Sequence, residues 1–221
     1  MTILRRLSRI LGLGALAAER GVTVIPLQGF SRWGHVEPFA WLCSEMLPQA
    51  IQTFVILDRD YRSDAEITRI ESSFKTAGIA AHIWRRKELE SYLLTPSVIA
   101  RLSGASVPEV AAWLNASSKE MESDVFGRLL DERMRQDKSA SQHAVSITSR
   151  FKTEFDSLWL DEAFRLRTCP PKQLISKINT QLQCAGHRTV SSSSLARGHR
   201  IAEVPDELAT LLRDVEEVIN R

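Results

Sequence analysis

Apolar runs separated by amphipathic stretches divide the first part of the chain into alternating strands and helices. Short runs rich in β-branched residues predict strands over residues 22–29, 53–58 and 79–84. Between them, apolar residues recur at helical spacing over residues 36–47 and 67–74. This alternating order predicts an α/β fold, in which a parallel sheet is covered by helices on both faces.

The second part of the chain is predicted to be mostly helical. Beyond residue 94, prolines open several helical patterns, and no further strand-like run follows. Ser106 and Glu109 have the spacing of a capping box at the start of one helix, and apolar residues recur through residues 208–219 of the last helix. We therefore expect an α/β domain over residues 1–94 and a helical extension over residues 95–221 that packs on it.

Composition and charge leave the function open. Hydrophobic residues make up 43% and charged residues 25%, which is typical of globular proteins, and a net charge of +2 is too small to indicate a nucleic-acid-binding protein. Cys43, Cys169 and Cys184 lie far apart without a CxxC pair, which argues against a zinc site or disulfide framework and favours the reducing cytoplasm. The absence of any run of about 18 apolar residues predicts no membrane span.

Acidic residues follow two of the predicted strands. Asp58 and Asp60 close the strand over residues 53–58, and Glu88 and Glu90 follow the strand over residues 79–84. In open α/β sheets, ligands bind at the carboxyl ends of the strands. Because residues two apart in extended backbone point the same way, Asp58 and Asp60 are expected to approach one hard cation, such as Mg²⁺ or Mn²⁺.

Each of these acids also has an ordinary explanation. Asp58 and Asp60 fit a turn or a helix start, with Arg59 and Arg62 as ion-pair partners. The segment RRKELES fits either a solvated helix start or a set of cations for the phosphate backbone. Taken together, however, carboxylates at adjacent strand ends repel one another unless cations balance them, which favours a metal site.

Several segments resemble one protein family in the same order along the chain. The segments GVTVIPLQGFS, VILDRDYRS and HIWRRKELESYLL resemble the TOPRIM region of OLD-family (overcoming lysogenization defect) proteins. Further on, CPPKQLISKIN resembles the lysine-bearing segment of that family and EVPDELATLL resembles its closing helix. The resemblance thus covers almost the whole chain, and in that family the TOPRIM region commonly follows an ABC-type ATPase domain.

The resemblance implies metal-dependent cleavage or nicking of DNA. It assigns Asp58, Asp60 and Glu90 to the binding of Mg²⁺ or Mn²⁺, Lys172 to the charge that builds on the phosphate, and Glu88 to a further catalytic role. DNA and an ABC-type ATPase domain or subunit are the expected partners, with a second copy of the chain as a further candidate. The sequence has no Walker motif, so any ATP dependence would come from the ATPase.

One part of the family pattern is missing. TOPRIM domains begin with a strand that ends in a glutamate, whereas Met1 and Thr2 lead straight into the helix that follows this strand. We therefore expect a C-terminal fragment or split subunit of a longer ATPase–nuclease. The alternatives are a strand donated by a partner, or a degenerate module that binds a partner ATPase or nucleic acid without cutting. A sheet without its central strand is expected to rearrange, associate or be unstable.

Overall fold

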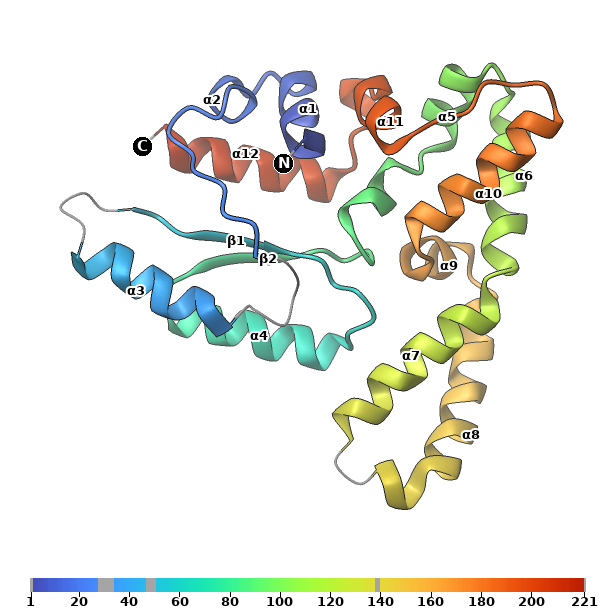
Figure 1. Cartoon of the computed structure of the whole chain (residues 1–221), viewed down its shortest axis with the longest axis horizontal. Coiled ribbons are helices and arrows are strands. Elements are labelled where there is room, and N and C mark those ends of the chain that lie inside the picture. The colour runs from blue at the N-terminus through green and yellow to red at the C-terminus, as the bar shows by residue number, and fades with distance from the viewer. Residues whose placement is uncertain (1, 28–33, 47–50, 138–139, 221) are drawn as a thin grey trace. The chain divides into compact units, whose positions relative to one another are not determined.

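The chain forms two compact units that are mostly helical. The computed structural model describes residues 2–27, 34–46, 51–137 and 140–220. The first unit comprises residues 1–58, 65–84 and 193–221, and the second comprises residues 59–64 and 85–192. In the described residues, one small parallel sheet accompanies the helices, which agrees with the predicted α/β class at its coarsest level (Figure 1).

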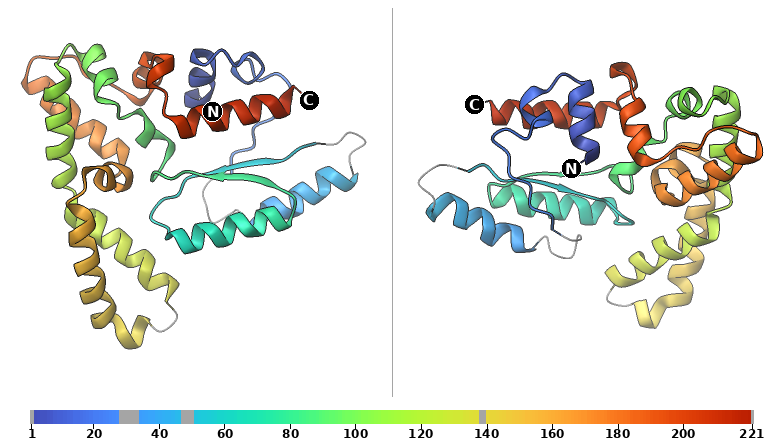
Figure 2. Two further views of the ribbon diagram at one scale, coloured as in Figure 1. Left: turned by 180° about the vertical axis from the view of Figure 1, so that it is seen from behind. Right: turned by 45° about the horizontal axis from the view of Figure 1, so that its top comes forward.

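The first unit holds the sheet, in which strands β1 and β2 run parallel with Phe54 opposite Ala80 and Leu57 opposite Ile83. In Figures 1 and 2, helices α3 and α4 lie on one side of the sheet and α12 lies on the other. The elements in chain order are α1 (Thr2–Ile10), α2 (Gly14–Ala17), α3 (Val36–Met46), β1 (Phe54–Leu57), α4 (Asp64–Thr76), β2 (Ala80–Ile83), α11 (Ser192–Gly198), η3 (Ile201–Glu203) and α12 (Asp206–Ile219).

The two faces of the sheet differ because strand side chains alternate between them. Every second residue of β1 is buried on the face that packs against α3 and α4. On the opposite face, His82 of β2 is half-buried, and its Nε2 lies 3.1 Å from Oε1 of Glu207 in α12. The buried core on the first face consists of Val36, Val55, Leu57, Ile70, Phe74, Ile79 and Ile83.

Two of the three predicted strands are confirmed, as β1 and β2. The strand predicted over residues 22–29 is wrong where the structure describes it, because residues 22–27 form no strand; Gln28 and Gly29 lie outside the described residues. Pro26 has no N–H for a strand ladder, and the side chains of Val24 and Ile25 are 46% and 55% exposed, so little apolar burial favours pairing. The described sheet consequently has two strands.

The last helix belongs to the first unit, so the division differs from the predicted boundary between residues 94 and 95. The reason is that α12 packs against α2 and buries an apolar face within this unit. The Glu216 carboxylate also accepts hydrogen bonds from the amides of Ala15 at 2.9 Å and Leu16 at 2.7 Å, which caps α2. The buried residues of α12 are Leu208, Ala209, Leu211 and Leu212.

The second unit is built from helices, as the sequence predicts for most of this region. The predicted capping box of α6 is confirmed, because Ser106 Oγ accepts from the Glu109 amide and Glu109 Oε2 accepts from the Ser106 amide. No helix among the described residues of either unit is long and apolar enough to cross a membrane. The elements are η2 (Leu89–Leu93), α5 (Pro96–Ser103), α6 (Val107–Lys119), α7 (Glu122–Gln136), α8 (Ala140–Trp159), α9 (Glu162–Thr168) and α10 (Pro171–Cys184).

We predict that Glu216→Ala lowers the free energy of unfolding by about 2 kcal/mol, because it leaves two amides of α2 without their charged acceptor. Asp214→Ala, at an exposed position of the same helix, is the matched control and should cost less than about 0.5 kcal/mol. Chemical denaturation followed by circular dichroism measures both values. Equal effects of the two substitutions would contradict the capping role.

Candidate functional site

The main chain of Lys87 joins three segments of the second unit. Its carbonyl accepts a hydrogen bond from the amide of Asp60 at 2.8 Å, and its amide donates to the carbonyl of Arg167 at 2.8 Å. Asp60 lies in the turn that follows β1, Lys87 lies just before η2, and Arg167 lies near the end of α9. These bonds hold the segments that follow β1 and β2 next to the residues that connect α9 to α10.

A buried arginine holds that junction in place. The guanidinium of Arg165 donates to the carbonyls of Trp159 and Leu160 and to Oδ1 of Asn115, so it ties α9 to the end of α8 and to α6. The chain then turns through Pro170 into α10, which packs against η2. Lys172 is therefore held in the first turn of α10 beside Glu88, which precedes η2, and Glu90 within it.

Six charged side chains form a row of alternating sign in this region. Lys87 Nζ lies 2.7 Å from Glu88 Oε1 and 3.5 Å from Asp60 Oδ1. Lys172 Nζ lies 3.6 Å from Glu88 Oε2 and 3.7 Å from Glu90 Oε1. We call this set the alternating charge group; in order of contact it consists of Arg62, Asp60, Lys87, Glu88, Lys172 and Glu90.

The two lysines of the alternating charge group differ in their surroundings. The Lys87 side chain is 10% exposed, and its ammonium lies 5.1 Å from the centre of the Tyr61 ring. Burial raises the pKa of the Tyr61 hydroxyl above its ordinary value, so this neighbour stays neutral. Lys172 is 71% exposed, and the carboxylates of Glu90 and Glu88 raise its pKa. Lys87 is thus a fixed internal cation, whereas Lys172 is a solvent-facing one.

The structure brings together four of the five residues predicted for the site: Asp60, Glu88, Glu90 and Lys172. Asp58 is exposed and belongs to the first unit. The expectation that Asp58 and Asp60 point the same way is not supported, because its premise of extended backbone is wrong. β1 ends at Leu57, and Asp60 has a φ of 53° in a turn, so strand alternation does not reach it.

Carboxylate oxygens suit Mg²⁺ or Mn²⁺, but their arrangement does not fit such an ion. In the part of the chain that the structure describes, no group of three or more His, Cys, Asp or Glu side chains is placed to hold a metal. Instead, lysine ammonium groups lie between the carboxylates of Asp60, Glu88 and Glu90. The positive charge at these acids therefore comes from the protein itself.

Sequence reasoning missed the part played by Lys87. The segment RRKELES predicts a solvated helix start or a phosphate contact for Lys87, yet its side chain is buried between two carboxylates. Arg86 is also used internally, since its guanidinium donates to the Ser91 carbonyl at 2.8 Å and lies 4.9 Å from the Tyr92 ring centre. The available signal was the sequence KELE, in which Lys87 directly precedes Glu88 and Glu90 follows two residues later.

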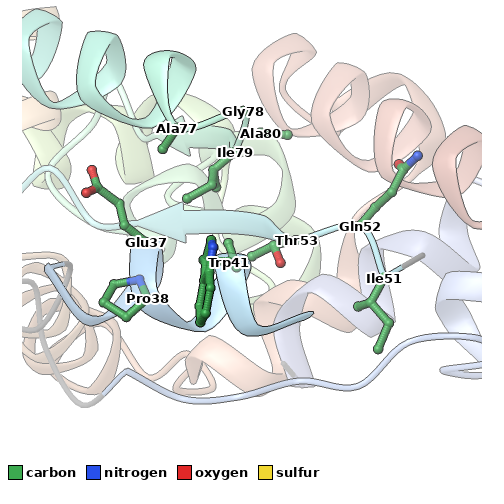
Figure 3. Close-up of a pocket in the computed structure, with 11 residues that line it drawn as sticks. Glu37, Pro38, Trp41, Ile51, Gln52, Thr53, Ala77, Gly78, Ile79 and Ala80 are labelled. Atoms are coloured by element: carbon green, nitrogen blue, oxygen red, sulfur yellow. The ribbon is translucent and has the colours of Figure 1, made fainter. Parts of the chain in front are cut away.

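A separate cavity of about 790 Å³ lies in the first unit. Figure 3 shows that its walls come from α3, from the segment before β1, and from the turn that leads into β2. Trp41 and Thr53 line it, but none of the predicted site residues does. It lies where the strands begin, whereas ligands of open α/β sheets gather where strands end, so we do not assign it to the predicted chemistry.

Comparisons with known proteins add no relative: no family model matches the chain, and neither the curated proteins nor the solved structures give a match. The resemblance to the TOPRIM region of OLD-family proteins therefore remains an expectation from the sequence segments.

We predict that the thiols will report how tightly the α9–α10 junction is packed. Cys169 is buried beside Pro170, and burial raises the pKa of its thiol to about 12, whereas Cys184 is exposed. Cys184 should therefore react rapidly with an alkylating reagent at pH 8, while Cys169 reacts only on unfolding. Raising the pH to about 9.5 should leave Cys169 of the folded chain unlabelled, because its thiol keeps its proton. Peptide mass spectrometry checks this, and equal labelling of both would refute it.

Proposed function

We propose that the chain is the metal-dependent endonuclease or nickase part of an OLD-type ATPase–nuclease system, with a TOPRIM-like sheet. The observation that carries the proposal is the convergence of Asp60, Glu88 and Glu90 with Lys172, which come from separate segments of the second unit. The sequence resemblance assigns the same residues to phosphodiester cleavage. DNA is the proposed substrate, and an ABC-type ATPase domain or subunit is the proposed partner.

The charges of this region suit hydrolysis at a phosphate. Positive charge must meet the phosphate oxygens as the bond breaks, and a carboxylate is needed to hold a cation or accept a proton. Lys172 faces solvent and can reach a phosphate, while Glu88 and Glu90 lie beside it. The sequence resemblance assigns Asp58, Asp60 and Glu90 to Mg²⁺ or Mn²⁺, whereas lysine ammonium groups contact the carboxylates of Asp60, Glu88 and Glu90 in the structure. The metal dependence in this proposal therefore rests on the resemblance.

A second function is favoured by one specific observation. Because Lys87 and Lys172 already neutralise the carboxylates, and because no three-ligand group is found among the described residues, the arrangement also suits a module that does not cut. Such a module would bind a partner ATPase or nucleic acid. The two functions differ in whether a divalent cation ever replaces the lysine contacts.

We predict Mg²⁺- or Mn²⁺-dependent nicking of supercoiled plasmid by the chain, alone or with an OLD-type ATPase domain added in trans. Asp60→Asn and Glu90→Gln should each lower the nicking rate at least about 100-fold, because each removes a carboxylate charge without changing the shape of the side chain. Lys172→Met should lower it to a similar degree, since positive charge at the phosphate is lost. Gel electrophoresis of nicked and supercoiled plasmid measures the rates.

Glu154→Gln is the matched control, because Glu154 is a carboxylate of the same unit that pairs with Arg133 on the surface. It should leave nicking unchanged. Nicking that is unaffected by Asp60→Asn and Glu90→Gln would remove these residues from the site. No nicking with either metal, in the presence of the ATPase domain, would reject cleavage in favour of the module that binds without cutting.

A further inference from the structure

Positive charge is concentrated in two segments of the chain that contain no acid. Residues 1–18 hold three arginines and no Asp or Glu, and residues 163–202 hold seven Lys and Arg and no Asp or Glu. The remaining residues hold more acids than bases, so the small net charge of the whole chain conceals this clustering. The two segments meet in the first unit, where α1 contacts Ser193 of α11.

Arg6 joins the two basic helices. Its guanidinium donates through Nη1 to the carbonyl of Ser193 at 3.0 Å and also to the hydroxyl of that residue. Figures 1 and 2 show α1 and α11 side by side. Residues three or four apart on a helix share a face, so Arg9 lies beside Arg6 on α1. By the same spacing, Arg197 lies beside Ser193 on α11. We call this surface the arginine patch; it consists of Arg6, Arg9, Ser193 and Arg197.

The charges of the arginine patch are not neutralised by acids. Arg9 and Arg197 are exposed, and Arg6 is half-buried. In the part of the chain that the structure describes, no carboxylate forms an ion pair with any of these three arginines. Arg5 of the same helix differs, because its guanidinium lies 3.2 Å from the carboxylate of Glu19. Three neighbouring arginines without an acidic partner repel one another, and a bound anion relieves this repulsion.

A phosphate backbone fits the arginine patch better than a lipid surface does. Guanidinium groups bind phosphates through two parallel hydrogen bonds, and serine hydroxyls are further backbone contacts. Each DNA strand carries one phosphate per about 3.4 Å of helix axis, so arginines about 5–6 Å apart can reach separate phosphates. Insertion of α1 into lipid would need its apolar face, but Leu4 and Leu7 are buried and α1 packs against α2.

We propose that the arginine patch binds the phosphate backbone of double-stranded DNA, without sequence preference and without a metal ion. The choice of DNA rests on the proposed function, to which the inference adds a binding surface in the first unit. Arginine contacts with phosphates release counterions from the duplex, so this contribution to binding falls steeply with salt concentration.

The experiment measures how DNA binding depends on salt, in the presence of a chelator so that no divalent cation takes part. Anisotropy of two fluorescent duplexes of unrelated sequence gives the affinity at several salt concentrations. Each phosphate contact contributes about −0.9 to the slope of log affinity against log salt. The double variant Arg9→Gln and Arg197→Gln should therefore make the slope shallower by about 1.8 with either duplex. At about 0.1 M salt, its affinity should be at least about 5-fold lower.

Arg69→Gln is the matched control, because Arg69 is an exposed arginine of the same unit on α4, across the sheet from α12 (Figure 1). It removes one charge from the unit and should leave the slope unchanged. The double variant Arg9→Lys and Arg197→Lys keeps both charges but loses the planar guanidinium, so it should keep the slope. Circular dichroism confirms that all variants keep the fold.

The inference is overturned if the unmodified chain does not bind the duplexes, or if the double glutamine variant keeps the slope of the unmodified chain. Equal changes of slope for this variant and Arg69→Gln also overturn it. Vesicles of phosphatidylserine and phosphatidylcholine provide a further arm: loss of vesicle binding in the double glutamine variant, with DNA binding unchanged, replaces DNA by an anionic membrane.

Failure of the proposed function is distinguishable from failure of the inference. DNA binding through the arginine patch without plasmid nicking retains the inference and rejects the nuclease. Plasmid nicking by a chain whose salt dependence does not involve Arg9 and Arg197 retains the nuclease and rejects the inference.

Discussion

The position of the candidate site depends on the two backbone hydrogen bonds of Lys87. Through them, the turn after β1, the segment before η2 and the end of α9 share one fixed junction. Backbone groups that are removed from water are costly to leave unpaired, so these bonds fix the register of the three segments. The side chains of Asp60, Glu88 and Lys172 follow from this register, since each lies within five residues of a bonded backbone group. The charged side chains lie close together because backbone hydrogen bonds hold their three segments side by side.

The stability of the fold does not explain the alternating charge group. An exposed pair such as that of Lys172 contributes at most about 1 kcal/mol. A buried pair such as Lys87 with Glu88 recovers only part of the cost of removing both charges from water, and well-packed apolar side chains would serve at least as well. Neither kind of pair therefore accounts for a row of six alternating charges just after two parallel strands.

The sequence predicts those parts of the fold that depend on local pattern. The strands β1 and β2 are paired as expected, and Val55, Leu57 and Ile83 contribute their side chains to one core. The segment around Val24 and Ile25 is also rich in β-branched residues but forms no strand. Pro26 lacks a backbone N–H for a strand ladder, and strand formation also needs a neighbouring strand and burial, which local composition does not encode. The placement of α12 likewise depends on a distant contact, that of Glu216 with α2.

The candidate site also depends on contacts between residues that are far apart in the sequence. The meeting of Lys172 with Glu88 and Glu90 was expected from the resemblance to a family, and no local rule predicts it. Strand alternation gave the wrong backbone conformation for Asp60, which lies in a turn with a φ of 53°. The basic character of RRK likewise did not show that Lys87 pairs with Glu88 inside the protein.

What separates the two candidate functions is the state of the carboxylates. Each oxygen of Glu88 faces a different lysine, Oε1 the buried Lys87 and Oε2 the exposed Lys172. Among the described residues, Glu90 pairs with Lys172. The charge of Glu90 is therefore compensated by a solvent-facing ammonium, whereas Glu88 also has an internal one. A module that binds without cutting keeps these contacts, whereas a metal-dependent nuclease has to give up at least the contact of Glu90.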